Sequence, residues 1–241
     1  MKWIITLIAA LCLTVPALAG EDTKTQHEQM LYPVVLVESS GGTGSGTVIF
    51  SDKRDGKMET YVLTNHHVIA GAVKVAKAWD PVKGEEVLKE TRSQVKGNWF
   101  IYNDMSRAVG SRAKTADIVA YDARWDLALL KIKDGETGEP FVAKVASRET
   151  VLHLFETSYA VGAGLGEPPF PTMGMLSNLD RQWEERRFIL SSAPIIFGNS
   201  GGALFHEGPA GYELIGVPSA VSAVWGGPVA HMAWSIPIDT V

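Results

Sequence analysis

The 241-residue sequence contains a single cysteine, Cys12, close to its N-terminus. An internal disulfide is therefore impossible, which excludes the disulfide-rich scaffolds of many small secreted proteins. A chain of this length buries enough apolar surface to fold without cross-links. Long apolar runs are also scarce. The run Trp3–Val15 is shorter than the roughly 18–20 residues that a membrane-spanning helix needs.

The N-terminus has the pattern of a secretory signal peptide. Lys2 supplies the positive end, Trp3–Val15 the apolar stretch, and Ala17–Ala19 a small-x-small cleavage site. We expect a signal peptide over residues 1–19, whose removal also removes Cys12; an uncleaved anchor is the alternative. The mature protein is then exported, to the periplasm or the medium, without a stable membrane anchor.

Basic patches, nucleotide motifs and metal-binding motifs are lacking as well. The formal net charge is −5, which gives no indication of a nucleic-acid partner. The glycine-rich stretch 41–46 has no lysine at the P-loop position and continues as a strand, so a phosphate-binding loop is disfavoured. No spacing typical of metal ligands occurs. We expect neither a metal nor a cofactor.

A serine between glycines is the most informative feature that is present. The segment F-G-N-S-G-G-A-L (197–204) places Ser200 on a turn that leads into an apolar strand. Such a turn exposes the hydroxyl and directs consecutive backbone N–H groups into one small space, as acyl transfer requires. By itself the segment is also compatible with a glycine-rich tight turn.

Two upstream segments favour the catalytic interpretation. The run Y-V-L-T-N-H-H-V-I (61–69) ends in a polar turn with two histidines, and D-A-R-W-D-L-A-L-L-K-I (122–132) places Asp126 at the start of an apolar strand. A carboxylate that enters a buried strand needs hydrogen-bond donors, and a histidine N–H is one. The order His, Asp, Ser is that of chymotrypsin-like enzymes and differs from the orders in subtilisin and the α/β-hydrolases.

The three motifs together resemble the trypsin-like serine proteases of the chymotrypsin fold, and within them the bacterial HtrA/Deg branch, which typically shows T-N-x-H-V, D-L-A-V-L-K and G-N-S-G-G. The likeness extends from about Val34 to Ile238. It implies an all-β fold of two six-stranded antiparallel β-barrels, with the active site in the cleft between them. The many short β-branched runs between Gly, Asp, Asn and Pro clusters indicate an all-β barrel or sandwich independently.

The family pattern implies a role for each motif residue. His67 directly precedes the valine and is the expected general base, whereas the neighbouring histidine fills a variable turn position. Asp126 precedes the apolar run and is the expected acid, and Asp122 belongs to the turn before it. Ser200 is the expected nucleophile. The backbone N–H groups of Gly198 and Ser200 form the expected oxyanion hole.

Alignment with the family also indicates a primary substrate pocket. Pro194, six residues before Ser200, offers no carboxylate to a Lys or Arg side chain. Ser219 is expected beside the triad, Val221 on the pocket rim and Met232 on the opposite wall. Because Val221 and Met232 narrow an apolar slot, we expect cleavage after small or medium aliphatic residues, with modest discrimination.

The two expected barrels follow from the same likeness, and the polar composition of Glu21–Met30 indicates a loose leader before them. After the signal peptide come a flexible leader (20–31), an N-terminal barrel (32–140) and a C-terminal barrel (141–241). The stretch of about residues 79–112 is longer than the family core needs, and we interpret it as an inserted hairpin or lobe. A solvated surface loop is favoured over a substrate-gating or partner-binding lobe, because exposed charge runs are usually solvated.

The sequence therefore predicts an exported serine endopeptidase that hydrolyses polypeptide substrates through an acyl-enzyme. One alternative is a catalytically silent or latent protease fold that serves as a binding or chaperone module. Another is an esterase, for which the α/β pattern is absent. The complete set of catalytic residues favours proteolysis.

The oligomeric state is not indicated. In the HtrA/Deg branch a PDZ domain normally follows I-P-I (236–238); a chain that stops at Val241 is either truncated or a free-standing protease domain.

Overall fold

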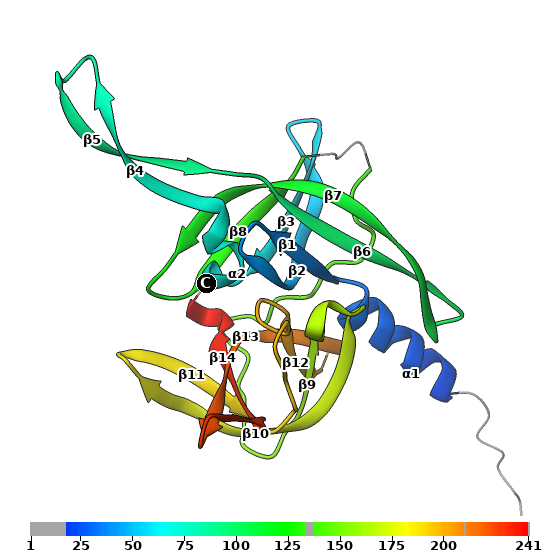
Figure 1. Cartoon of the computed structure of the whole chain (residues 1–241). Coiled ribbons are helices and arrows are strands. Elements are labelled where there is room, and N and C mark those ends of the chain that lie inside the picture. Colours follow the sequence, from blue (N-terminus) through cyan, green and yellow to red (C-terminus); the bar gives the residue numbers. More distant parts are fainter. Residues whose placement is uncertain (1–17, 134–136, 210, 241) are drawn as a thin grey trace, which may run out of the picture.

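The computed structural model describes residues 18–133, 137–209 and 211–240. The expected signal peptide falls outside the described residues except for its last two positions. Twelve of the described strands close into two six-stranded antiparallel barrels, one above the other in Figure 1. This confirms the predicted fold.

The first barrel has the strand order β1-β2-β3-β8-β7-β6 and the second β10-β11-β14-β13-β12-β9. The strands of the first barrel are β1 (Val34–Ser39), β2 (Gly42–Arg54), β3 (Lys57–Thr64), β6 (Val95–Asn103), β7 (Arg107–Asp122) and β8 (Leu127–Ile132). Those of the second are β9 (Thr157–Gly162), β10 (Phe170–Trp183), β11 (Arg186–Ser191), β12 (Ala203–Gly208), β13 (Gly211–Val224) and β14 (Gly227–Pro237). The short helices are α1 (Leu18–Gln26), η1 (His27–Leu31), α2 (His66–Ile69), η2 (Ala70–Ala72), η3 (Gly164–Gly166) and η4 (Ile238–Thr240).

Apolar side chains at alternate strand positions fill each barrel. In the first barrel Val48 of β2 pairs directly with Val62 of β3, and both are buried. Side chains two residues apart share one face of a strand, so such pairs repeat toward the barrel axis. In the second barrel Leu204 of β12 and Ile215 of β13 belong to the equivalent buried cluster. Each barrel therefore has its own apolar core.

A third apolar cluster joins the two barrels. It combines Leu63 and Leu127 of the first barrel with Phe188, Val217 and Ile236 of the second. These residues are buried, which removes apolar area from water on both sides of the junction and stabilises it. Leu127 follows Asp126 in sequence, so the junction fixes the start of β8 against the second barrel.

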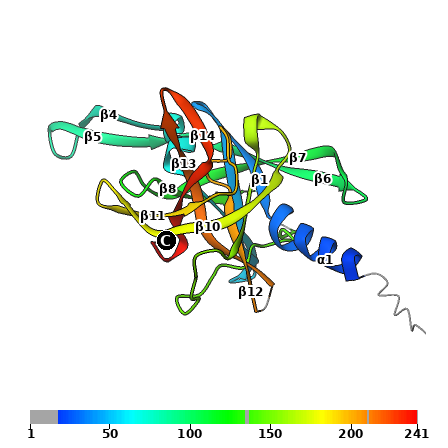
Figure 2. The same ribbon diagram turned by 90° about the horizontal axis from the view of Figure 1, so that it is seen from below.

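A two-stranded hairpin stands outside both barrels. Its strands, β4 (Val73–Asp80) and β5 (Glu85–Arg92), pair only with each other and project away from the first barrel in Figures 1 and 2. It leaves the barrel just after α2 and η2. Of the segment predicted as an insert, 79–112, the part from Val95 onward supplies barrel strands β6 and β7, whereas the projecting hairpin begins earlier, at Val73.

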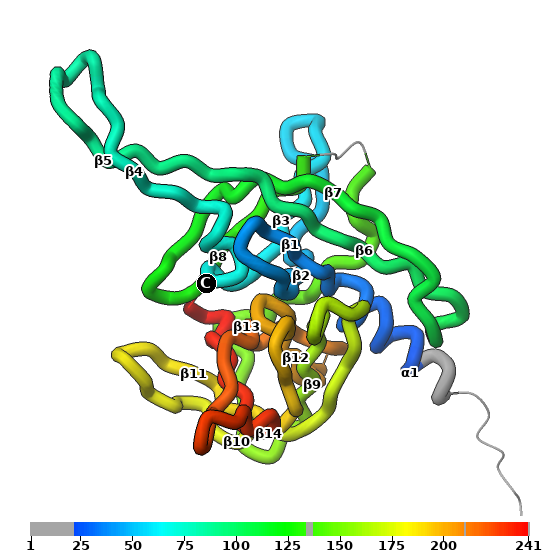
Figure 3. Tube along the Cα trace, in the orientation of Figure 1, coloured from blue at the N-terminus to red at the C-terminus, as the bar shows by residue number. Residues whose placement is uncertain are grey.

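The segment predicted as a flexible leader is helical instead. α1 and η1 follow one another and run into β1, as the blue end of the trace in Figure 3 shows. Met30 and Leu31 are buried against the second barrel, and Gln29 accepts the backbone N–H of Tyr212 (2.8 Å). Among the described residues, no helix has the length and apolar character needed to cross a membrane.

Candidate active site

A histidine and an aspartate face each other at one end of the first barrel. His67 lies on α2, directly after β3, and Asp126 directly precedes β8, the neighbour of β3 in the barrel. Nδ1 of His67 lies 2.8 Å from Oδ2 and 3.0 Å from Oδ1 of Asp126. The backbone N–H of His67 also donates to Oδ1 (2.9 Å). Strand pairing thus brings together two residues 59 positions apart in sequence.

The carboxylate of Asp126 has a second donor from the other barrel. The hydroxyl of Ser219, on β13, donates to Oδ2 at 2.7 Å. Burial raises the pKa of Asp126, but the hydrogen bonds from His67 and Ser219 outweigh it and hold the pKa below its ordinary value. Asp126 is therefore ionised at neutral pH. An ionised carboxylate accepts the Nδ1–H of His67, which leaves the lone pair of Nε2 free to act as a base.

The backbone of Asp126 is itself unusual. Its φ is +55°, in the left-handed region that non-glycine residues seldom adopt, although aspartate tolerates it better than most. The side-chain amide of Asn65 donates to the carbonyl oxygen of Asp126 (2.8 Å) and fixes this conformation. Asn65 is fully buried. The T-N-H-H motif thus contributes a support for the aspartate as well as the histidine.

The other histidine and aspartate of the motifs lie elsewhere. The ring of His66 stacks on Tyr121, with centroids 4.9 Å apart. The carboxylate of Asp122 accepts the backbone N–H groups of Arg124 (2.8 Å) and Trp125 (3.0 Å), which is an aspartate stabilising its own turn. Asp122, the last residue of β7, thus supports the turn to which it was expected to belong, whereas His66 is the first residue of α2 rather than part of a turn.

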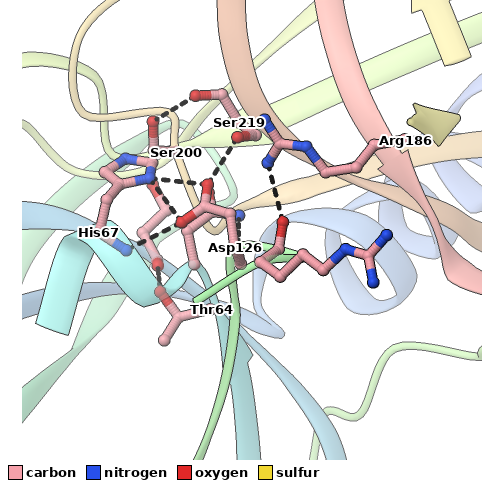
Figure 4. Close-up of polar contacts among 9 residues, drawn as sticks. Thr64, His67, Asp126, Arg186, Ser200 and Ser219 are labelled. Carbon is pink, nitrogen blue, oxygen red and sulfur yellow. Dashed lines mark hydrogen bonds and ion pairs between the residues drawn. The ribbon is translucent and has the colours of Figure 1, made fainter. Parts of the chain in front are cut away.

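Ser200 reaches the same place from the second barrel. Figure 4 shows Ser200 and Asp126 gathered around the ring of His67. The hydroxyl of Ser200 donates to the carbonyl oxygen of Ser219 at 3.3 Å. Its own carbonyl oxygen accepts the backbone N–H of Ser45, on β2, at 2.7 Å. The structure therefore brings the three predicted triad residues together, with the serine hydroxyl bonded to a backbone carbonyl.

The turn before Ser200, where the oxyanion hole is expected, is closed by a backbone hydrogen bond. The N–H of Asn199 donates to the carbonyl oxygen of Ile196 (3.1 Å), which closes a four-residue turn. Gly198, the third residue of this turn, has φ +98°. A positive φ at that position is characteristic of a type II turn and favours glycine. The turn type fixes how the peptide groups on both sides of Gly198 point.

The peptide groups that carry the two expected donors are each fixed through their carbonyl side. The carbonyl oxygen of Phe197 accepts the N–H of Leu165, on η3, at 2.7 Å, and that of Asn199 accepts the N–H of Gly202 at 3.0 Å. In a trans peptide the C=O and the next N–H point in opposite directions. These bonds therefore turn the N–H groups of Gly198 and Ser200 away from Leu165 and Gly202. An oxyanion hole needs donors preorganised in this way.

The four residues predicted to form the substrate pocket lie on neighbouring segments of the second barrel. Ser219 touches Asp126 and Ser200 through the bonds described above. Val221 packs against the core of the second barrel and pairs with Ala233, the residue after Met232. Pro194 is exposed and precedes Ile195, whose N–H donates to the carbonyl oxygen of Ala230 on β14.

Sequence reasoning missed two residues that support the turn. Ser45 lies in G-S-G-T-V-I, part of the glycine-rich stretch that continues as a strand, and no role was assigned to it from the sequence. Its hydroxyl donates to the carbonyl oxygen of Gly198 (2.6 Å) and accepts the N–H of Ala163 (2.7 Å). Leu165 acts through its backbone, so its side chain carries no signal. A serine enclosed by glycines before a buried strand was the one available indication.

No group of His, Cys, Asp or Glu side chains in the described part of the chain has an arrangement suited to a metal ion. The histidine of the site is instead hydrogen-bonded to a carboxylate, as a general base requires. The arrangement provides an alcohol, a base with its orienting acid and two backbone donors. These are the components of acyl transfer by a serine.

Comparison with known sequences identifies the family. A family model described as "Trypsin-like peptidase domain" matches residues 44–217. The chain belongs to the trypsin-like peptidase family. The match spans the segments that carry His67, Asp126 and Ser200, and it confirms the resemblance that the motifs implied.

Individual relatives agree with this assignment. A probable periplasmic serine endoprotease, DegP-like, of Buchnera aphidicola subsp. Schizaphis graminum is 29% identical over 203 residues, which cover 82% of this chain and 34% of the relative. The periplasmic pH-dependent serine endoprotease DegQ of Escherichia coli K12 is 29% identical over 201 residues, 81% of this chain and 35% of that protein. This peptidase domain thus spans about a third of the length of these relatives.

Among solved structures, the HtrA-type protease AlgW with a tripeptide superposes with a TM-score of 0.64 at 24% identity, over 90% of this chain and 60% of that one. A variant of AlgW, also with a tripeptide, gives the same TM-score at 23% identity and the same coverage. At these identities the likeness shows the fold. It agrees with the double barrel described above.

Proposed function

We propose that this peptidase domain is an exported serine endopeptidase that cleaves polypeptides through an acyl-enzyme. The observation that carries the proposal is the bifurcated contact of His67 Nδ1 with an ionised Asp126 beside Ser200. Together with two preorganised backbone donors it supplies every group that the reaction needs. The relatives are named as periplasmic serine endoproteases, which supports both the proposed hydrolysis of polypeptides and the proposed export.

In the proposed mechanism the hydroxyl of Ser200 leaves the carbonyl oxygen of Ser219 and turns to Nε2 of His67. Its oxygen attacks the scissile carbonyl carbon while its proton passes to Nε2. The N–H groups of Gly198 and Ser200 stabilise the oxyanion that forms. When the C–N bond breaks, His67 returns the proton to the leaving amine. Water then hydrolyses the ester by the same steps and regenerates Ser200.

One observation favours a second candidate, a latent site. The hydroxyl of Ser200 is bonded to the carbonyl oxygen of Ser219 and must turn toward Nε2 before His67 accepts its proton. A protein that keeps the hydroxyl in this bond would bind polypeptides without cleaving them. The two candidates differ in whether the serine reacts with an electrophile.

A fluorophosphonate probe separates the two candidates. It reacts with a serine only where nucleophile, base and oxyanion hole are assembled together. We expect labelling of the wild-type protein at Ser200, identified by mass spectrometry of the labelled peptide, and none of Ser200→Ala. A folded wild-type protein that stays unlabelled would support the latent, binding-only candidate instead.

The proposed specificity is for small or medium aliphatic residues before the scissile bond. Met232, which is 38% exposed, and Val221 are the residues that we propose to narrow the slot. In a peptide library we expect cleavage after Val, Ala or Ile to exceed cleavage after Phe or Arg by about 10–200-fold, the range that one methylene group is worth in a hydrophobic pocket. Met232→Ala is expected to raise cleavage after Phe relative to Val. Rapid cleavage after Arg by the wild-type protein would contradict the assignment.

A further inference from the structure

Ser45 is buried, with no exposed area, and uses every hydrogen-bonding group that it has. Its N–H donates to the carbonyl oxygen of Ser200 (2.7 Å), and its own carbonyl oxygen accepts the hydroxyl of Thr64 (2.6 Å). Its hydroxyl donates to the carbonyl oxygen of Gly198 (2.6 Å) and accepts the N–H of Ala163 (2.7 Å). One residue of the first barrel thus contacts three segments of the site.

The position of the hydroxyl bond within the turn gives it a specific effect. Three consecutive peptide groups run from Phe197 to Ser200, and the outer two carry the oxyanion donors. Backbone bonds from Leu165 and Gly202 hold those outer groups. The carbonyl oxygen of the middle peptide group, that of Gly198, is held by the hydroxyl of Ser45. Ser45 is therefore the side chain that fixes the orientation of this peptide from the opposite barrel.

We infer that Ser45 is a positioning residue for the oxyanion hole. Its hydroxyl holds the Gly198–Asn199 peptide, and this keeps Gly198 at the positive φ that aims its N–H into the hole. Because the same hydroxyl accepts the N–H of Ala163, it also fixes the start of η3, whose Leu165 holds the neighbouring peptide. The inference deepens the proposed function and rests on it.

Removal of the hydroxyl leaves the partly buried carbonyl oxygen of Gly198 and the buried N–H of Ala163 without their partner. Buried unpaired polar groups are costly, so the turn relaxes toward conformations that pair them differently. Loss of an oxyanion donor outright costs about 10²–10³ in kcat. Ser45→Ala is therefore expected to lower kcat about 10–100-fold, because the donor is misdirected for part of the time rather than deleted.

The matched control is Ser158→Ala. Ser158 is also fully buried and its hydroxyl makes a single bond, to the hydroxyl of Ser191 (2.8 Å), inside the second barrel. Ser158→Ala controls for the loss of stability that follows when the hydroxyl of a buried serine is removed. We expect Ser45→Ala to lower kcat and the rate of fluorophosphonate labelling at unchanged KM, whereas Ser158→Ala lowers neither. The midpoint of the pH–rate profile should not move in Ser45→Ala, because the base and its acid are intact.

A measurement without catalysis separates failure of this inference from failure of the proposed function. In the Ser200→Ala background, glycine-selective ¹⁵N NMR reports the amide of Gly198. We expect Ser45→Ala to shift or broaden this resonance and Ser158→Ala to leave it in place, even if the wild-type protein proves inactive. An unchanged Gly198 resonance in Ser45→Ala, or a fall in kcat matched by Ser158→Ala, would overturn the inference.

Discussion

Asp126→Asn is expected to lower kcat, and with it kcat/KM, by about 10⁴, the loss in kcat when the aspartate of such a triad becomes an amide. The carboxylate of Asp126 accepts from both Nδ1 and the backbone N–H of His67. An amide offers one acceptor and a donor, so its NH₂ group favours the His67 tautomer with the proton on Nε2. That tautomer cannot take the proton of Ser200. Steady-state kinetics on a peptide substrate measure the effect.

Asp122→Asn is the matched control for this substitution. Asp122 stands four residues earlier and binds two backbone N–H groups of its own turn. The same chemical change there is expected to affect kcat/KM less than about threefold, because it changes no group that contacts His67. Similar losses in both variants would show that the turn as a whole, and not the His67–Asp126 contact, supports activity.

The lowered pKa of Asp126 also predicts how the difference in stability between the wild-type protein and Asp126→Asn depends on pH. A carboxylate whose pKa is depressed by folding stabilises the fold above its unfolded value, about 3.9, and this contribution disappears as the pH falls through the folded value. The wild-type protein should therefore have a larger free energy of unfolding than Asp126→Asn at pH 7. Denaturant unfolding should show the difference from Asp126→Asn shrinking below about pH 4.

The sequence predicted those parts of the site where the side chain itself does the chemistry. His67, Asp126 and Ser200 are identified by residue type and by neighbours, and the structure brings them together. The role of Ser45 was not predicted, because it depends on the direction of the carbonyl oxygen of Gly198, which is a property of the folded turn. The bond from Leu165 is a backbone bond, which residue type does not encode.

The fold shows the same division between local and tertiary information. Short apolar runs between clusters of Gly, Asp, Asn and Pro predicted the barrel strands, and members of two such runs, Val48 and Val62, pair with each other in the buried core of the first barrel. Residues 20–31 were predicted to be flexible because their composition is polar. They are helical because the end of η1 buries Met30 and because Gln29 binds Tyr212, residues distant in sequence. Tertiary contacts of this kind supply most of the stability of helices in proteins.

Gly198→Val is expected to lower kcat by at least about 10²–10³, the cost of an oxyanion donor, while the two barrels remain folded. A Cβ at this position would lie 2.6 Å from the carbonyl oxygen of Ala163 and 2.7 Å from the nitrogen of Leu165. Both are backbone atoms, so they cannot move away from the new Cβ as the end of a flexible side chain could. The φ of +98° is in addition strained for valine. The turn must therefore change its conformation, which moves the N–H of Gly198 out of the oxyanion hole.

Gly84→Val distinguishes this effect from backbone strain alone. Gly84, at the tip of the β4–β5 hairpin, also has positive φ (+67°), but its Cβ would meet no atom within 4 Å. Valine there introduces comparable strain far from the turn, and kcat is expected to stay within about twofold. Circular dichroism checks that both variants fold. Since only the Gly198 substitution displaces the peptide held by Leu165, a fully active Gly198→Val would show that the oxyanion is stabilised by groups other than this turn.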